Sequence, residues 1–265
     1  MRSPRALALP LLCWSMPLFC AALPSAQATE PGAFTPAPAL QAIFEAEGET
    51  PYPSPYAGIL NFSALQSKYD SGHGHGYRNE LKVAPKHRLS AAATDERFSA
   101  LVTATMPAGA KTIVAQYHAE GLDTLLKVYV QDTADSKALD GQAGNGVFDV
   151  LVRIKGQDGK ETMTALGTVR SGESFGLDIA VSGGEATVAV NTGKHGAVHT
   201  VPTRIKNTGE NIYFKFGDYL QALDPATQAH TTNREKWDQY YQLNRISSSQ
   251  VRFSQTIFQR GRSQP

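Results

Sequence analysis

From residue 59 onward, short runs of the chain alternate polar with bulky apolar side chains, and turn signals separate one run from the next. A period of two is typical of a strand that buries one face. The runs predict strands at residues 77–84, 97–105, 111–119, 124–132, 147–154, 162–169, 175–182, 185–191, 211–221 and 248–257. We therefore expect an all-β protein, a β-sandwich of the jelly-roll type, whose concave sheet would form a groove with the shape to fit an extended polymer.

Three of these runs carry polar rows that would each lie on one face of a sheet. The rows are Arg78, Glu80 and Lys82; Gln116 and His118; and Lys215, Tyr219 and Gln221. In the third run, Phe214, Phe216 and Leu220 form the opposite row, which we expect to face the core. Asp218 interrupts that apolar row, and the pattern gives it no place. A cation, an amide, an imidazole and a phenol on one face can remove a proton beside a carboxylate and break the neighbouring bond.

The first 28 residues predict a secretory signal. Arg2 and Arg5 precede an apolar stretch over residues 6–23, and Ala26-Gln27-Ala28 fits an A-x-A cleavage site. Because prolines interrupt the stretch and the cleavage pattern follows it directly, we interpret it as cleaved rather than as a membrane anchor. We expect a periplasmic or secreted protein that has no membrane contact after cleavage.

The remaining chain predicts one folded domain. Residues 29–58 are rich in proline and alanine, and we interpret them as an irregular lead-in with a short helix around residues 39–47. Residues 59–265 contain no internal repeat and no low-complexity linker, so we expect a single jelly-roll domain. The only helical stretch expected within it lies near residues 234–242.

Composition narrows the classes of ligand. Both cysteines, Cys13 and Cys20, lie in the predicted signal, so the mature domain would contain no disulfide and no cysteine-bound metal. The chain has 25 basic and 24 acidic side chains, and cleavage removes two arginines and no acids, which leaves a net charge of about −1. Such a balance does not support nucleic-acid binding, and a polyanionic ligand would have to meet a local basic row.

A run of histidine and glycine, His73-Gly74-His75-Gly76, precedes the first polar row. Two imidazoles two residues apart can point the same way on a strand and bind a metal. The glycines and the lack of a clear third ligand favour a loop at the entrance of the groove, where either histidine can touch substrate. We therefore expect no metal and no other required cofactor.

Taken in order, the three polar rows resemble the motifs of polysaccharide lyase family 7, the alginate lyases. That family carries R-[ST]-E-[LV]-R, Q-[IV]-H and Y-F-K-x-G-x-Y-x-Q. The third motif matches at every specified position from Tyr213 to Gln221. The second keeps Gln116 and His118 around Tyr117, and the first keeps Arg78, Glu80 and Leu81 but has Asn79 and Lys82 at its variable and last positions. Each motif is weak alone, whereas three in order on predicted strands are strong.

The resemblance implies cleavage of a 4-linked polyuronate by β-elimination. Arg78 and Gln116 would neutralise the carboxylate beside the C5 hydrogen and stabilise the enolate-like charge. His118 would act as the base and Tyr219 as the acid that protonates O4. Where the C5 hydrogen and the leaving oxygen lie on the same side of the ring, Tyr219 would serve as both. We also expect the polymer to contact Lys82, Lys215, Gln221, Asn79 and Tyr117.

Glu80 has a different expected role. A carboxylate between Arg78 and Lys82 on one strand face would hold these cations in place rather than react. A glycosidase needs two carboxylates across the scissile bond, and Glu80 is the only acid on the three rows, which disfavours that class.

Two alternatives stay open at this stage. A non-catalytic carbohydrate-binding sandwich would keep a groove without needing the amide, imidazole and phenol together. Within the lyases, the departures from the motifs leave the preference among mannuronate, guluronate and other uronates such as those of glucuronan undecided. We predict a monomeric lyase that acts on an acidic polysaccharide, alginate before the others.

Overall fold

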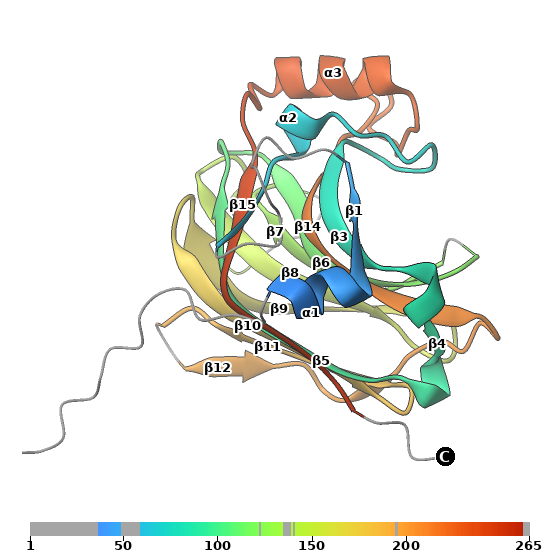
Figure 1. Cartoon of the computed structure of the whole chain (residues 1–265). Helices are drawn as coiled ribbons and strands as arrows, with labels where there is room; N and C mark the ends of the chain where they lie inside the picture. Colours follow the sequence, from blue (N-terminus) through green and yellow to red (C-terminus); the bar gives the residue numbers. More distant parts are fainter. Residues whose placement is uncertain are drawn as a thin grey trace, which may run out of the picture. The chain divides into compact units, whose positions relative to one another are not determined.

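Two antiparallel sheets dominate the computed structural model, which describes residues 37–48, 59–121, 123–134, 139, 141–193 and 196–261. The predicted signal lies outside these residues. All that follows concerns the compact unit from Pro31 onward. Figure 1 shows the arrangement of its strands and helices.

The first sheet, here called the groove sheet, carries the three polar rows. Its order is β1 (Phe44–Glu47), β3 (Arg78–Val83), β14 (Asn211–Leu220), β6 (Lys111–Ala119), β7 (Thr124–Gln131), β8 (Val147–Lys155) and β9 (Glu161–Arg170), with β4 (Leu89–Ser90) paired to β14. Thus β14 lies between β3 and β6. The three strands that bear the motifs are direct neighbours, although they come from distant parts of the chain.

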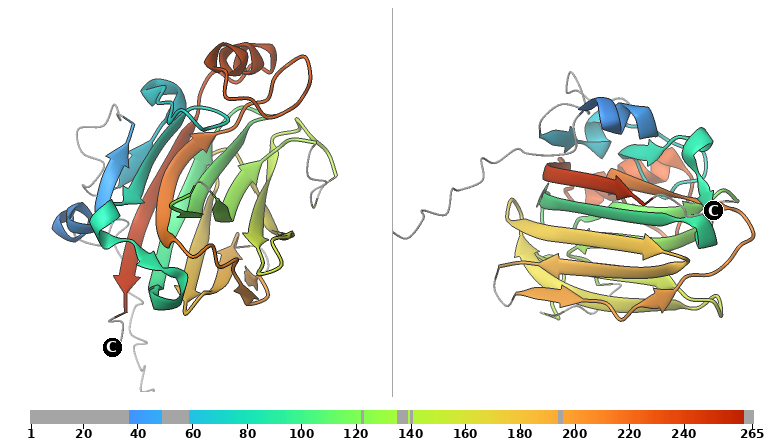
Figure 2. Two further views of the ribbon diagram at one scale, coloured as in Figure 1. Left: turned by 90° about the vertical axis from the view of Figure 1, so that its right-hand side faces the viewer. Right: turned by 60° about the horizontal axis from the view of Figure 1, so that its bottom comes forward.

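The second sheet, here called the outer sheet, packs against the first. Its order is β12 (Ala197–His199), β11 (Glu185–Asn191), β10 (Ser174–Ser182), β5 (Asp95–Thr105), β15 (Gln250–Arg260) and β2 (Leu60–Phe62), with β13 (Thr203–Arg204) paired to β11. The right-hand view of Figure 2 shows its long strands side by side. Every predicted strand is present within a few residues, and the all-β sandwich fold is confirmed.

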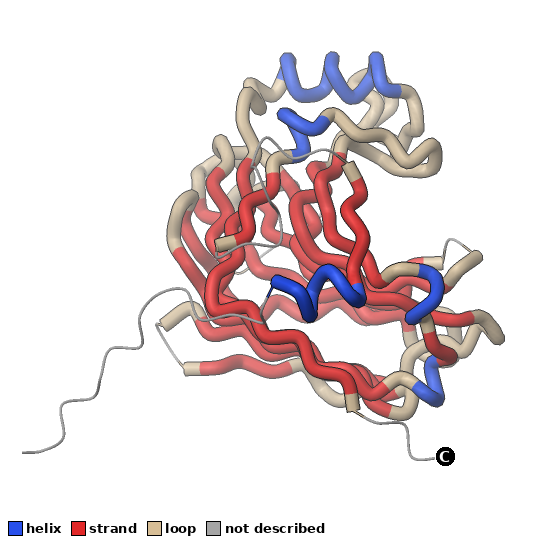
Figure 3. The backbone as a smooth tube through the Cα atoms, viewed as in Figure 1, coloured by secondary structure: helices blue, strands red, loops and turns tan. Residues whose placement is uncertain are grey.

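Helices are short and lie outside the sheets, as Figure 3 shows. They are α1 (Ala37–Ile43), α2 (Ala64–Ser67) and α3 (Arg234–Leu243), together with the 3-10 turns η1 (Pro85–His87) and η2 (Ala91–Ala93). The helix predicted near 234–242 is α3, which begins where the Asn233 side chain accepts hydrogen bonds from the N–H groups of Glu235 and Lys236. None of the helices in the described part of the chain has the length and apolar character needed to cross a membrane.

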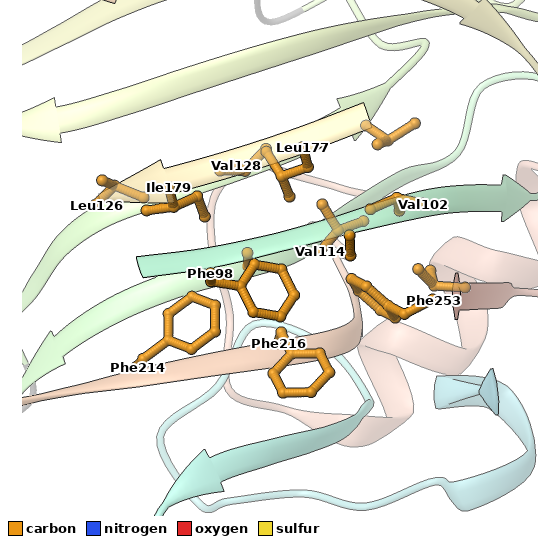
Figure 4. Packing of buried hydrophobic residues seen from close by; sticks show 14 of the residues in the cluster. Phe98, Val102, Val114, Leu126, Val128, Leu177, Ile179, Phe214, Phe216 and Phe253 are labelled. Atoms are coloured by element: carbon orange, nitrogen blue, oxygen red, sulfur yellow. The ribbon is translucent and has the colours of Figure 1, made fainter. Parts of the chain in front are cut away.

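The core lies between the sheets and is rich in phenylalanine (Figure 4). Phe214 of β14 lies 4.8 Å from Phe98 of β5 and 5.8 Å from Phe216, measured between ring centroids. Phe253 of β15 closes the cluster at 5.1 Å from Phe216. Each buried ring stabilises the fold by roughly 1.5–3 kcal/mol. The apolar row of β14, formed by Phe214, Phe216 and Leu220, therefore faces the core, as the alternation of the sequence predicts.

The structure of the segment before residue 59 differs from the predicted short helix. The helix expected over residues 39–47 ends at Ile43, and the chain continues as β1, which pairs with β3 so that Glu47 lies opposite Glu80. Phe44 is buried in the core, 5.5 Å from Phe216. The prediction of helix was wrong at residues 44–47, because an alternation of four residues is too short to indicate a strand by itself.

Candidate active site

A groove of about 500 Å³ crosses the face of the groove sheet that points away from the core. Strands β1, β3, β14, β6, β7, β8 and β9 all contribute lining side chains. Six of the predicted site residues line it, namely Arg78, Gln116, His118, Lys215, Tyr219 and Gln221. The sheet order explains why residues from distant motifs meet, since Tyr219 pairs laterally with Arg78 on one side and with Ile113 on the other.

A buried ionic cluster forms one wall of the groove. Arg78 lies 3.5 Å from Glu80 and 3.9 Å from Glu47, and Lys215 lies 3.1 Å from Glu80 and also pairs with Glu47. All four side chains are 7% exposed or less. The lysine and arginine keep the pKa of Glu47 below its usual value although burial raises it. The carboxylates therefore hold the two cations in place.

This cluster revises the expected role of Glu80. Glu80 does hold Arg78, but its second cation is Lys215 rather than Lys82. Lys82 instead forms ion pairs with Glu45 at 3.3 Å and with Glu47 at 3.9 Å, and its side chain is 24% exposed. The Lys215 side chain is almost fully buried between Glu47 and Glu80. It therefore places a fixed positive charge just beneath the groove surface and has little freedom to move.

A chain of hydrogen bonds connects this cluster to His118. Gln116 Nε2 donates to Glu80 Oε1 at 2.6 Å, and Gln116 Oε1 lies 2.9 Å from His118 Nε2. An ionised carboxylate can only accept, so the amide must turn its oxygen toward the histidine. His118 Nε2 consequently donates, and Nδ1 keeps the lone pair. Among the described residues this Nδ1 has no hydrogen-bond partner.

The surroundings of His118 keep its ring neutral. Burial lowers the pKa of His118 well below 6.5, and the charges of Lys215 and Arg78 lower it further. The ring stacks on Tyr213, with centroids 5.7 Å apart and an interplanar angle of 23°. A neutral imidazole can accept a proton, and the nitrogen that keeps the lone pair is buried beside the groove.

Tyr219 is held from two sides. The guanidinium carbon of Arg78 lies 3.8 Å from the centroid of the Tyr219 ring, and the backbone N–H of His75 donates to the Tyr219 hydroxyl at 2.7 Å. The neighbouring Tyr219, Glu80 and Glu47 raise the pKa of Arg78, although burial by itself lowers it. The groove thus combines a fixed cation, a neutral imidazole and an oriented phenol.

Asn79 and Tyr117 are placed on the other face, which corrects the expectation that they contact a polymer. Tyr117 is fully buried and its hydroxyl donates to Glu96 at 2.9 Å. Asn79 accepts a hydrogen bond from the N–H of Ser63 at 3.2 Å. Because successive side chains of a strand point to opposite faces, a residue between two groove residues points toward the core.

Asp218, which the pattern left without a place, is a buried acceptor on the core face of β14. It accepts hydrogen bonds from Thr112 Oγ1 at 2.6 Å, Ser249 Oγ at 2.5 Å and the N–H of Ala64 at 2.8 Å. Burial raises the pKa of Asp218 while these donors oppose the shift. The carboxyl therefore joins β6, α2 and the residue before β15 on the side of β14 that faces away from the groove.

Gly217 explains the glycine of the third motif. A Cβ at this position would lie 2.3 Å from the carbonyl oxygen of Asn79 and 2.7 Å from Cα of Glu80, and its φ is 152°. The pairing of β14 with β6 shifts register between Phe216 and Tyr219. Only glycine permits this close approach to β3, so the local irregularity sets the position of Tyr219.

Several lining residues were not found from the sequence. Glu47 was hidden in the lead-in segment, and Tyr213 belongs to the third motif but had no assigned role. Lys127 and Arg153, which face each other across β7 and β8, extend the basic wall and share Glu161 at 2.9 and 3.7 Å. In the sequence, both residues alternate with apolar neighbours, which indicates a polar strand face. Neither belongs to one of the three motifs, so nothing distinguished them from ordinary surface residues.

The histidine loop carries no metal site that the described residues define. Within the described ranges, no group of three or more histidine, cysteine, aspartate or glutamate side chains has the arrangement of a metal site. His73 and His75 both line the groove, and the His75 ring lies 4.6 Å from that of His230. The loop therefore belongs to the groove wall.

Comparisons with protein families and with solved structures agree with the arrangement of the groove residues. The family model described as alginate lyase matches residues 38–259. A comparison with curated protein sequences gave no significant match.

Among solved structures, an alginate lyase from Alteromonas sp. 272 is 33% identical, with a TM-score of 0.77, over 86% of this chain and 99% of that one. The polysaccharide lyase family 18 structure aly-SJ02 is also 33% identical, with a TM-score of 0.75, over 83% of this chain and 96% of that one. The exolytic PL7 alginate lyase AlyA5 from Zobellia galactanivorans is 14% identical, with a TM-score of 0.56, over 78% and 85% of the two chains. At that identity the likeness concerns the fold alone.

Proposed function

This chain belongs to the alginate lyase family, and we propose that it cleaves alginate by β-elimination with Arg78, Gln116, His118 and Tyr219 as its reacting groups. The resemblance carried by the three motifs is confirmed by the family match and by relatives at 33% identity. The chain is a polysaccharide lyase, and its substrate is an acidic polysaccharide. The assignment of individual residues is our proposal.

The observation that carries the residue assignment is the chain of hydrogen bonds from Glu80 through Gln116 to His118. It leaves a neutral imidazole, whose Nδ1 is buried without a hydrogen-bond partner, on the wall of a groove that Arg78 and Tyr219 also line. Arg78 supplies a permanent charge beside the substrate carboxylate, which makes the C5 hydrogen more acidic. Gln116 can give its second amide hydrogen to the same carboxylate.

The reaction then proceeds without an added co-reactant. His118 accepts the C5 proton, the electron pair of that bond forms the C4–C5 double bond, and the C4–O4 bond breaks. The departing O4 takes the proton of the Tyr219 hydroxyl. Exchange with water afterwards returns a proton to Tyr219 and removes one from His118. The products are a new non-reducing end with an unsaturated uronate and a shortened chain.

Residues around this centre would hold the polymer. Gln221 lines the groove, and Lys127 and Arg153 provide positive charge on the side of β7 and β8. We further propose that the protein works in the periplasm or outside the cell, on the basis of its N-terminal pattern, and that it acts as a monomer.

The test is an ultraviolet assay for unsaturated uronate ends. The purified mature protein is given alginate, polymannuronate, polyguluronate and glucuronan, each with and without a chelator. We expect absorbance to rise with alginate and to survive the chelator, and the faster of the two homopolymers identifies the preferred uronate. Binding to alginate without any rise in absorbance would contradict the proposed function and favour a carbohydrate-binding protein.

A further inference from the structure

The loop before β3 reaches the groove with its backbone. The N–H of His75 donates to the Tyr219 hydroxyl at 2.7 Å, and the carbonyl oxygen of His75 accepts from the N–H of Ala222 at 2.8 Å. The backbone of one loop residue is therefore bonded both to the phenol and to the chain just beyond β14. This fixes the N–H relative to the Tyr219 oxygen.

Two glycines allow this approach. A Cβ on Gly74 would lie 2.6 Å from Nη2 of Arg78 and 3.2 Å from the Tyr219 hydroxyl. A Cβ on Gly76 would lie 1.9 Å from the carbonyl oxygen of Leu220. Contacts this short exclude a side chain at either position unless the neighbours move. The glycines of the histidine run therefore let a backbone lie against Arg78 and Tyr219, which explains them without a metal.

The imidazole of His75 points to a different neighbour. Its Nδ1 lies 3.3 Å from the carbonyl oxygen of Thr231, and its ring lies 4.6 Å from that of His230. The side chain of His75 thus contacts the loop before α3, whereas its N–H contacts the phenol. The two parts of this residue can be tested separately.

The direction of the hydrogen bond has a chemical consequence. A backbone N–H can only donate, so the Tyr219 oxygen is the acceptor and its own hydrogen is left for another group. In the described part of the chain, no other hydrogen bond to this hydroxyl is found. When the hydroxyl gives up its proton, the phenolate that remains faces the His75 N–H, and the Arg78 guanidinium lies over its ring.

We propose that the backbone N–H of His75, brought into place by Gly74 and Gly76, is part of the acid machinery of Tyr219. It orients the hydroxyl hydrogen toward the departing O4 and stabilises the phenolate formed when the C4–O4 bond breaks, as backbone donors stabilise an oxyanion. The inference rests on the proposed role of Tyr219 in the lyase reaction. It assigns to the histidine run a function that needs neither of its imidazoles.

The sharpest test removes the N–H and keeps the side chain constant. In a His75→Ala background, the amide between residues 74 and 75 is replaced by an ester and compared with His75→Ala that retains the amide. A hydrogen bond to a charged oxygen accounts for roughly 10- to 100-fold in rate, so we expect kcat on alginate to fall by about that factor. KM should stay nearly unchanged because the N–H faces the phenol rather than the polymer.

A second substrate distinguishes acid catalysis from simple displacement. An oligouronate with a nitrophenoxy group at position 4 of the reacting sugar has a leaving group that needs no acid. We expect the ester and the amide proteins to cleave it at similar rates. An equal loss on both substrates, or an undiminished kcat on alginate, would overturn the inference. If the unaltered protein cleaves no polyuronate, the proposed function itself fails, and this inference falls with it.

Gly74→Ala provides an independent steric test. Its Cβ would displace both Arg78 and Tyr219, so we expect kcat to fall on alginate and on the activated substrate alike. The matched control is Gly176→Ala in β10, where a Cβ would meet nothing closer than 3.6 Å. The control should retain full activity and an unchanged melting temperature. Full activity of Gly74→Ala would show that the close approach is not required and would count against the proposal.

Discussion

The groove sheet and the outer sheet use the same alternation of polar and apolar residues in opposite ways. In β10 of the outer sheet, buried and more exposed residues alternate along nearly the whole strand, whereas in β6 of the groove sheet eight of nine positions are buried. The outward-facing row of β10 is partly or fully exposed to solvent. The polar row of β6 meets other protein groups.

The charges of the two sheets show what this difference means. The Arg97–Asp178 pair of the outer sheet has side chains that are 63% and 31% exposed, while Arg78 and Glu80 in the groove are 6% and 0% exposed. Water screens the first pair, but the second must be satisfied within the protein. Burying charges in the groove sheet costs desolvation free energy. In return, the charged groups interact strongly and are held in fixed positions, as a reaction requires.

The largest contrast should appear in catalysis. We expect His118→Ala and Tyr219→Phe each to lower kcat on alginate by roughly 10²- to 10⁴-fold, because each removes a proton-transfer group. Circular dichroism and retention on immobilised alginate should match the unaltered protein. Near-normal turnover by either variant would remove that residue from the mechanism.

The next largest effect concerns stability. Glu80→Gln should lower the free energy of unfolding by about 3–5 kcal/mol, because it takes a partner from Arg78 and Lys215 in a buried cluster. The matched change in the outer sheet, Asp178→Asn, should cost less than about 1 kcal/mol. Urea denaturation measures both. Similar losses in the two variants would show that the sheets do not differ in this way.

A third effect is a dependence on pH that originates in the groove sheet. The pKa of His118 is lowered by burial and by nearby cations, so below about pH 6.5 the unfolded chain binds a proton that the folded protein does not. Stability should therefore fall as the pH drops from 6.5 toward the folded pKa, and His118→Gln should reduce this slope. For the same reason, the acid limb of kcat/KM should lie below pH 6.5. Thermal melting and initial rates across this range test both expectations, and a limb at or above pH 6.5 would contradict them.

The smallest effect is expected on the outer sheet. Arg97→Ala should change the free energy of unfolding by no more than about 1 kcal/mol and leave kcat on alginate unchanged, because its ion pair with Asp178 is exposed to solvent. A loss of activity would mean that the outer sheet influences the groove, which the packing between the sheets gives no reason to expect.

Local patterns predicted the strands and the faces of most motif residues, with Asn79 and Tyr117 as the exceptions. A period of two follows from backbone geometry, so the groove row of Lys215, Tyr219 and Gln221 and the core row of Phe214 and Phe216 can be read along the chain. The same rule would have placed Asn79 and Tyr117 on the core face, and their membership in motifs misled the prediction. The three motifs also determined the family, because residue types in order are a property of the sequence itself.

Only the tertiary structure decided which groups meet. The bond from the His75 N–H to Tyr219 joins residues 144 positions apart, and the bond from the Ala64 N–H to Asp218 joins residues 154 positions apart. Glu47 reaches Lys215 because β1 pairs with β3 and β3 with β14. Such partners depend on the order and register of strands and on the path of loops. These follow from the packing of the whole chain, and no local period encodes them.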